Sequence, residues 1–186
     1  MTDEHDQLDR ARELDKQAIG EIYDQYAAKI YAYLYRRVSH AQTAEDLTGD
    51  VFVRFVKAIE DGQTWHTSVR AWLYRVAHNR LVDFYRQQPE EPSLSLDERL
   101  IADTEGPDSA LAEALSYRAL RSAISELTEG QQEVLALRFA ERLQAKEVAA
   151  VLNKSVGAVE VQQHRALRRL RKILNEQQEE EGEEDV

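Results

Sequence analysis

Residues 145–174, AKEVAAVLNKSVGAVEVQQHRALRRLRKIL, contain two amphipathic segments separated by three polar residues. Ala149 is small at the point where two helices would cross. Asn153 follows where the backbone needs a positive φ, which Asn adopts more readily than most residues other than glycine. Ser155 suits the N-cap of the second segment, and Val159 points back to the core. This spacing predicts a helix-turn-helix, whose second helix enters the major groove of DNA. The apolar spacing alone fits an ordinary helical hairpin equally well.

The second segment carries a concentrated positive charge. Residues 162–174 contain no acid and five bases, which are Arg165, Arg168, Arg169, Arg171 and Lys172. Cations gathered on one helix neutralise phosphates and release counterions, so they favour DNA binding. A basic face that only complements the C-terminal end of a helix more often mixes Glu with Lys. The charge therefore favours a DNA-binding helix over a merely solvated one.

Apolar residues spaced three and four apart predict three helices in the first half of the chain. The first covers residues 17–38. The second follows a capping box at Thr43 and Asp46 and ends at Asp61-Gly62. The third is capped by Thr67 or Ser68.

The second half predicts four more helices. One ends near residue 127, and the next follows a capping box at Thr128 and Gln131. The last two cover residues 145–152 and about 156–174. Their apolar side comprises Val148, Leu152, Ala166, Leu167 and Leu170. Because no strand-like alternation occurs, we predict an all-α fold.

Composition and charge narrow the function classes. The 186 residues include 24 Lys and Arg, 35 Asp and Glu, and no Cys, for a net charge of −11. The absence of Cys excludes disulfides, thiolate zinc sites and a cysteine nucleophile. The longest apolar run, residues 30–35, is too short to span a membrane, so we expect a soluble cytoplasmic protein. A total of −11 argues against DNA binding, but its distribution does not.

The acid is confined to particular segments. Residues 89–116 carry −7, residues 176–186 carry −7, and residues 117–175 carry +5. All three prolines fall between residues 89 and 107, and proline disfavours helix. We therefore predict two small helical domains, 1–88 and 117–175, joined by an acidic flexible linker over 89–116. Residues 176–186 are predicted to form a disordered acidic tail.

Both domains resemble a known family. The stretches IGEIYDQYAAKIYAYLYRRV, AEDLTGDVFVRFVKAI and VRAWLYRVAHNRLVDFYRQ resemble the core-binding and promoter-melting domain of bacterial RNA polymerase sigma factors of the sigma-70 family. The stretch AISELTEGQQEVLALRFAERLQAKEVAAVLNKSVGAVEVQQHRALRRLR resembles their C-terminal DNA-binding domain. With an acidic linker in place of a middle domain, the order resembles that of the extracytoplasmic-function (ECF) subgroup. The resemblance covers residues 17–88 and 117–174. It implies a factor that directs core polymerase to promoters in transcription initiation, without catalysis and without a cofactor or metal.

The resemblance assigns the second helix to the clamp of RNA polymerase. The residues concerned are Glu45, Asp46, Leu47, Asp50, Val51, Phe52 and Phe55. Phe52 lies off the predicted core face, and an exposed aromatic residue suits an interface anchor. The alternative is that Phe52 belongs to the core.

The resemblance assigns the following loop and third helix to the proximal promoter element. Melting requires unstacked bases to be captured by aromatic, amide or guanidinium groups. The candidates are Trp65, His66, Arg75, His78, Asn79, Arg80, Asp83, Tyr85 and Arg86. Trp72 is expected to be core. His78 stands where many relatives carry Arg.

The resemblance assigns the second helix of the helix-turn-helix to the upstream promoter element. The candidates are Ser155, Gly157, Ala158, Glu160, Gln162, His164, Arg165 and Arg168. Gln can bind adenine and Arg can bind guanine through paired hydrogen bonds. Glu160 departs from a stretch that is usually richer in Lys, Ser and Arg. An anti-sigma factor and the flap of polymerase are further implied partners.

Several alternatives stay open. The linker is either a nucleic-acid mimic for a basic channel or an acidic spacer, and the tail either aids solubility or inhibits the basic helix. A stand-alone helix-turn-helix regulator fits the C-terminal part, although no dedicated dimerisation helix is evident. A small helical enzyme is disfavoured, since neither a metal-ligand motif such as HExxH nor a nucleotide-binding loop occurs.

Overall fold

The computed structural model describes residues 8–62, 68–87 and 118–184, and every regular element within these ranges is a helix. The elements are α2 (Lys16–Val38), α3 (Ala41–Glu60), α4 (Val69–Gln87), α6 (Glu129–Leu135), the π-helix η1 (Ala136–Ala140), α7 (Ala145–Leu152) and α8 (Val156–Glu184). Residues 8–12 and 118–125 are also helical. The all-α prediction is confirmed. No helix in the described ranges is long and apolar enough to cross a membrane.

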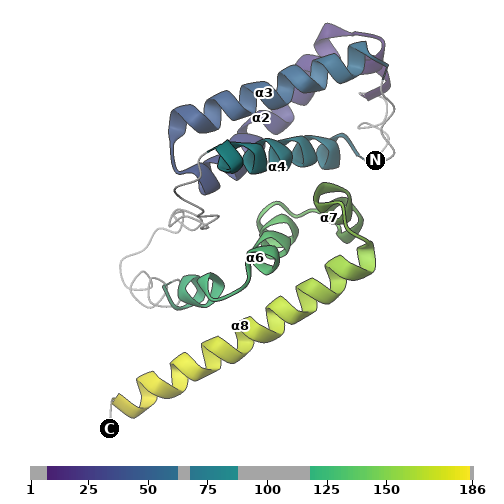
Figure 1. Ribbon diagram of the computed structural model, residues 1–186. Coiled ribbons are helices and arrows are strands. Elements are labelled where there is room, and N and C mark those ends of the chain that lie inside the picture. Colours follow the sequence, from purple (N-terminus) through teal and green to yellow (C-terminus); the bar gives the residue numbers. More distant parts are fainter. Residues whose placement is uncertain (1–7, 63–67, 88–117, 185–186) are drawn as a thin grey trace.

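The N-terminal half, residues 8–87, packs α2, α3 and α4 around one apolar core (Figure 1). Tyr33, Val51, Phe55 and Leu73 are fully or almost fully buried there. Trp72 lies in the same core with its ring 5.9 Å from that of Phe55, which confirms the expectation that Trp72 is a core residue.

The start of α3 differs from the predicted capping box. The helix begins at Ala41, and its N-cap is His40, whose Nδ1 accepts a hydrogen bond from the Thr43 amide at 3.3 Å. The reason lies in Ser39, which ends α2 in the left-handed region at φ 52°. The turn between the helices is therefore shorter than Thr43 would require. The other two predicted ends, Asp61-Gly62 after α3 and Ser68 before α4, are confirmed.

The C-terminal half, residues 118–184, contains the predicted helix-turn-helix. Asn153 ends α7 at φ 52°, Ser155 accepts a hydrogen bond from the Ala158 amide at 3.1 Å, and Val159 is fully buried. The capping box of Thr128 and Gln131 is also present. The π-helix η1, which directly continues α6, was not expected from the sequence.

Two expectations for α8 are wrong. Leu167 is 42% exposed, because the buried row of α8 runs through Val159, Ala166, Leu170 and Ile173 and leaves position 167 turned away. The helix also continues to Glu184 instead of ending near residue 174. Glu and Gln are good helix formers, so the sequence after residue 174 supplies no stop signal before Gly182.

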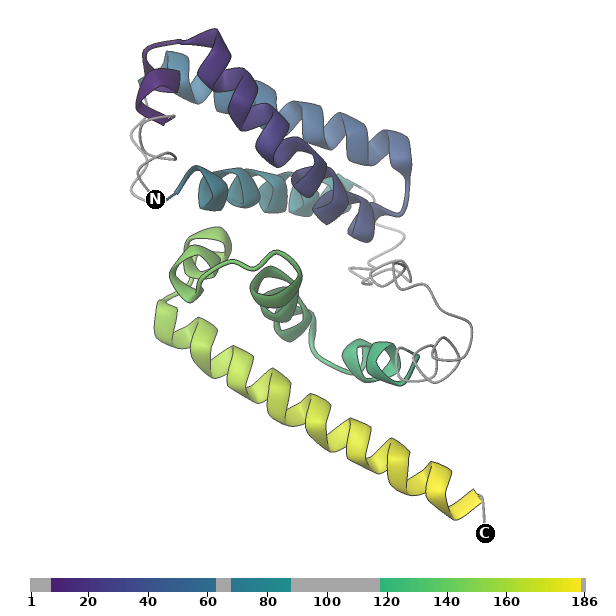
Figure 2. The same cartoon turned by 180° about the vertical axis from the view of Figure 1, so that it is seen from behind.

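The two halves lie against each other, with α4 facing α6 and α7 in both views (Figures 1 and 2). Val134, Leu137, Val148 and Val159 of the C-terminal half belong to the same apolar cluster as the core of the N-terminal half. A second, smaller cluster joins α8 to α6 and residues 123–127. The halves are therefore held by a continuous apolar contact, which the sequence alone did not predict.

Glu133 of α6 forms a buried polar contact between the halves. One carboxylate oxygen accepts a hydrogen bond from the Tyr33 hydroxyl at 2.9 Å, and the other accepts from the Arg37 guanidinium at 2.7 Å. The Arg37 guanidinium lies 3.9 Å from the centre of the Tyr33 ring. The Nδ1 atom of His78 lies 3.4 Å from the same carboxylate.

Two further glutamates of the C-terminal half also contact the N-terminal half. The Glu141 carboxylate pairs with Arg36 and accepts a hydrogen bond from the Tyr74 hydroxyl at 2.6 Å. Arg70 donates to the backbone carbonyl of Glu141. Ser68 donates to the Glu147 carboxylate at 2.6 Å. We call Glu133, Glu141 and Glu147 the docking glutamates.

The surroundings of Glu133 determine its ionisation. Burial alone would raise the pKa of this carboxyl, but the charge of Arg37 and the hydrogen bond from His78 lower the pKa from 4.5 to about 2. The ionised form is therefore the one that the closed arrangement stabilises. A carboxylate with a depressed pKa stabilises the folded state above its unfolded pKa and loses that contribution as the pH falls.

We expect Glu133→Gln to lower the free energy of unfolding by about 3 kcal/mol near neutral pH, because Arg37 then stays buried without a counter-charge. The difference from the unsubstituted chain should shrink between pH 4.5 and about pH 2, as Glu133 itself becomes protonated. Urea denaturation followed by circular dichroism measures this. Glu129→Gln, an exposed change on the same helix, is the control. A difference that stays constant across this pH range would contradict the assignment.

Candidate polymerase and nucleic-acid interfaces

The predicted polymerase-binding residues divide between two faces of α3. Leu47, Val51, Phe52 and Phe55 are buried in the core of the N-terminal half. Glu45 and Asp46 are exposed, and Asp50 is half-exposed. Only the three acids therefore reach the surface, where Asp50 pairs with Arg54 and Arg80 while Glu45 and Asp46 make the N-terminal part of the outer face of α3 negative.

Phe52 is core, so the expectation that it is an exposed anchor is wrong. Phe52 is 7% exposed, and its ring packs edge-on against Tyr23 of α2, with ring centres 4.8 Å apart. The sequence missed this because Tyr23 covers Phe52 from another helix. The neighbouring Val53 is 52% exposed and supplies the apolar surface beside the acids. Its exposure was not predicted, although it follows from the periodicity once Phe52 is placed in the core.

The described proximal-promoter candidates lie on α4, with Trp65 and His66 outside the described residues. Arg75, Asn79 and Arg86 are exposed. Their spacing of four and seven residues places them on one side of the helix. Arg80 and Asp83 are half-exposed, and Arg80 pairs with Asp83 at 3.4 Å and also with Asp50 of α3.

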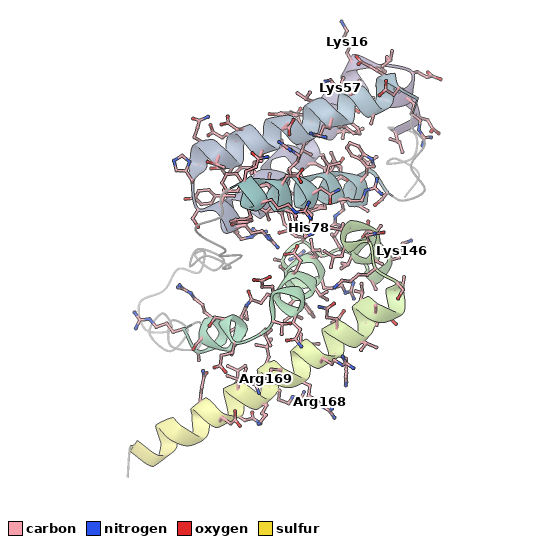
Figure 3. All side chains as sticks on the ribbon, viewed as in Figure 1. Lys16, Lys57, His78, Lys146, Arg168 and Arg169 are labelled. Atoms are coloured by element: carbon pink, nitrogen blue, oxygen red, sulfur yellow. The ribbon has the colours of Figure 1, made fainter. Side chains whose placement is uncertain are left out.

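Two other candidates on α4 lie on a different side of the helix. His78 points toward α6, where it meets Glu133 and the Tyr33 hydroxyl (Figure 3). The Tyr85 hydroxyl donates to the backbone carbonyl of Arg37 at 2.6 Å. Neither is on the face that Arg75, Asn79 and Arg86 share, so the structure does not bring all the predicted residues together.

The upstream-element candidates lie along the first half of α8. All are exposed except Gln162, which is half-exposed and accepts a hydrogen bond from Lys154 at 2.8 Å. The exposed residues are Ser155, Gly157, Ala158, Glu160, His164, Arg165 and Arg168. Arg168 lies on the side of α8 away from the rest of the molecule (Figure 3).

The five bases of α8 differ in their partners. Arg169 lies 3.8 Å from Glu126, and Lys172 lies 3.3 Å from Glu176. Arg165, Arg168 and Arg171 form no ion pair with any described residue, so their charges are available to an external anion. Among the described residues, no group of three or more His, Asp and Glu side chains is arranged to hold a metal ion.

A three-helix unit with an acidic outer face and a helix-turn-helix with a cationic outer face define a class of DNA-binding proteins that also engage a protein partner. Comparison with known proteins makes the class specific. The profile of Sigma-70 region 2 matches residues 22–90, and that of Sigma-70 region 4 matches residues 117–170.

Curated relatives agree with these profiles. The chain is 34% identical to the ECF RNA polymerase sigma factor BldN of Streptomyces coelicolor over 169 residues, covering 90% of this chain but 64% of that protein. It is 32% identical to the RNA polymerase sigma factor YlaC of Bacillus subtilis, covering 89% of this chain and 97% of that protein. This chain therefore belongs to the sigma-70 family of RNA polymerase sigma factors, in the ECF group.

The fold is also shared with solved structures. CnrH, solved in complex with the cytosolic domain of CnrY, matches with a TM-score of 0.65 over 92% of this chain and 97% of that chain, at 23% sequence identity. The sigma factor RpoE of Bartonella quintana, solved with the anti-sigma factor NepR, matches with a TM-score of 0.61 over 84% of this chain and 96% of that chain, at 18% identity. Both likenesses concern the fold alone.

We expect Phe52→Ala to lower the free energy of unfolding by about 3 kcal/mol, because it leaves a cavity beside Tyr23. Val53→Ala should change it by less than about 0.5 kcal/mol, since Val53 faces solvent. Urea denaturation of both variants measures the contrast. Equal, small effects would place Phe52 outside the core.

Proposed function

We propose that this protein binds core RNA polymerase, directs it to specific promoters and begins transcription there, acting in the cytoplasm as a binding factor without catalysis of its own. The observation that carries the proposal is the presence in one chain of both sigma-factor regions, each with an outward face of suitable charge. A stand-alone regulator would leave the acidic face of α3 without a role.

The polymerase-binding surface comprises Glu45, Asp46 and Asp50, with the exposed Val53 next to them on the same helix. Exposed acids steer the protein toward a basic partner, and an exposed apolar residue gains free energy when the partner covers it. The clamp of polymerase is the partner proposed for this surface. Residues 1–88 are proposed as the domain that holds it, and the flap of polymerase is proposed to contact residues 117–175.

The proximal promoter element is proposed to bind along the exposed side of α4, through Arg75, Asn79 and Arg86, with Trp65 and His66 in the preceding loop. Guanidinium groups hold phosphates, and an amide reads base edges. Arg80 and Asp83 lie beside this surface and are proposed to orient it.

The upstream element is proposed to bind the first half of α8. Arg165 and Arg168 carry the free charge that attracts the phosphate backbone, and Gln162 is placed to read a base. Glu160 repels phosphate but can accept a hydrogen bond from a cytosine amino group. Residues 89–116 are proposed as the linker between the two promoter-binding domains, and an anti-sigma factor is proposed as a regulator of the free protein.

We expect Arg165→Ala and Arg168→Ala each to weaken binding to duplex DNA carrying the upstream element. Each should also reduce the slope of log affinity against log salt by about one, because one phosphate contact is lost. Fluorescence anisotropy at several salt concentrations measures both effects. Lys57→Ala, an exposed cation on α3, is the control. Unchanged slopes in both arginine variants would move the DNA-binding face elsewhere.

We expect Asp46→Ala and Val53→Asp each to weaken association with core polymerase, by about 1–2 kcal/mol, while the helical content stays the same. Native gel shift and run-off transcription with purified core polymerase measure the loss. Glu60→Ala removes an acid from the end of the same helix and serves as the control. Core binding that survives both substitutions would exclude this surface.

A further inference from the structure

The face of the N-terminal half that the C-terminal half covers has an unusual composition. It presents arginines and aromatic rings from α2 and α4 side by side. These residues are Arg36, Arg37, Arg70, Tyr33, Tyr74 and His78. Guanidinium groups next to aromatic rings are the combination that nucleic-acid surfaces use, because the cations hold phosphates and the rings stack on bases. We call this surface the covered face.

Each arginine of the covered face is occupied by a group of the other half, and two of the three are held by carboxylates. Arg37 holds the carboxylate of Glu133, Arg36 holds that of Glu141, and Arg70 donates to the Glu141 carbonyl. Within the described residues, the ion-pair partners of Arg36 and Arg37 come from the C-terminal half alone. The covered face therefore has no counter-charge of its own at these positions.

Separation of the halves would change the state of these cations. Arg37 is 4% exposed and is almost fully enclosed by Tyr33 and Glu133, and a buried charge needs a partner. Once the docking glutamates leave, the arginines face solvent together. The planar fork of a guanidinium fits phosphate oxygens as well as it fits a carboxylate, so a phosphodiester backbone matches the same donors.

The covered face also joins a hollow that already opens to solvent. This hollow, of about 680 Å³, lies between α2, α4 and residues 140–147. Lys29 and Arg142 line it, and neither forms an ion pair with a described residue. Glu141 and Glu147 line the same hollow, so Lys29 and Arg142 extend the row of cations beyond the contact between the halves but share the hollow with two carboxylates until the halves part.

The position of the covered face connects it with the promoter. It lies on α4, the helix whose exposed side carries Arg75, Asn79 and Arg86. His78, one of the proximal-promoter candidates, belongs to the covered face and is held there by Glu133 (Figure 3). A DNA strand that follows the exposed side of α4 would meet the covered face next.

We propose that the covered face is a second DNA-binding surface, for the phosphodiester backbone of promoter DNA, and that the carboxylates of Glu133 and Glu141 occupy it in the free protein in place of phosphates. DNA and the C-terminal half then compete for the same arginines. The inference rests on the proposed function in one respect, which is that the ligand of α4 is DNA. It goes beyond that function by assigning Arg36, Arg37 and Arg70 to DNA.

The test uses the full chain with Glu133, Glu141 and Glu147 all changed to Gln. A matched variant changes the exposed Glu13, Glu60 and Glu129 to Gln, so that both proteins have the same net charge. Because the chain has no Cys, Lys57→Cys and Asn175→Cys provide two unique labelling sites for a distance measurement by energy transfer. Binding to one labelled strand, and to its duplex, is measured by anisotropy.

We expect the docking-glutamate variant to show a longer distance between the labels and to bind DNA about tenfold more tightly than the matched variant, because opening no longer opposes binding. Adding Arg70→Gln to this variant should remove much of the gain and lower the salt slope by about one, whereas adding Arg54→Gln should not. The two DNA probes decide whether single strand or duplex is the preferred form.

Three results would overturn the proposal: a variant that stays closed, one that opens without a gain over its matched control, or a gain that Arg70→Gln leaves intact. An opened variant that binds an acidic peptide but not DNA would also overturn it. If the triple variant loses helical content, Glu133→Gln with Glu141→Gln removes the carboxylates that hold Arg36 and Arg37, keeps the Glu147 cap of α7, and is judged by the same results against Glu60→Gln with Glu129→Gln. Failure here leaves duplex binding through Arg165 and Arg168 unaffected, so the proposed function is tested separately.

Discussion

Arg37 and Glu133 bury opposite charges against each other although they are 96 residues apart in the sequence. Removing two ions from water is costly, and their attraction offsets that cost only when the geometry is good and the remaining atoms are hydrogen-bonded. Tyr33 meets this condition twice, since its hydroxyl donates to Glu133 and its backbone carbonyl accepts from Arg37. The relative position of the two halves is therefore restricted to arrangements that keep this pair intact.

The closed arrangement leaves both outer faces free. The acidic face of α3 and the cationic side of α8 lie at opposite ends of the stack of helices, with α4, α6 and α7 between them (Figures 1 and 2). Contact with a protein partner at α3 thus requires no separation of the halves. What the arrangement conceals is the side of α4 that holds Tyr74 and His78. The contact between the halves therefore does not control access to the outer faces of α3 and α8. It can control when the concealed side of α4 becomes accessible.

Local features of the structure could be predicted from the sequence, whereas contacts between the halves could not. Asn153, Ser155 and the Thr128–Gln131 capping box form their hydrogen bonds within a few residues of the chain, so the helix ends that they define can be predicted from the sequence. The burial of Phe52 depends on Tyr23, and the role of Glu133 depends on two residues of α2. On periodicity alone these residues are indistinguishable from ordinary surface positions, because the partner that buries them is remote.

The π-helix η1 determines the direction in which Glu141 points relative to Glu133. Eight residues separate Glu133 from Glu141, and a regular α-helix, which turns about 100° per residue, would leave their side chains roughly 80° apart. A π-turn rotates less per residue because its hydrogen bonds span five residues, and this brings Glu141 back toward the side of Glu133. A change of length between positions 136 and 140 would therefore act by rotation: one residue fewer would turn everything after it, α8 included, away from the arginines of α2.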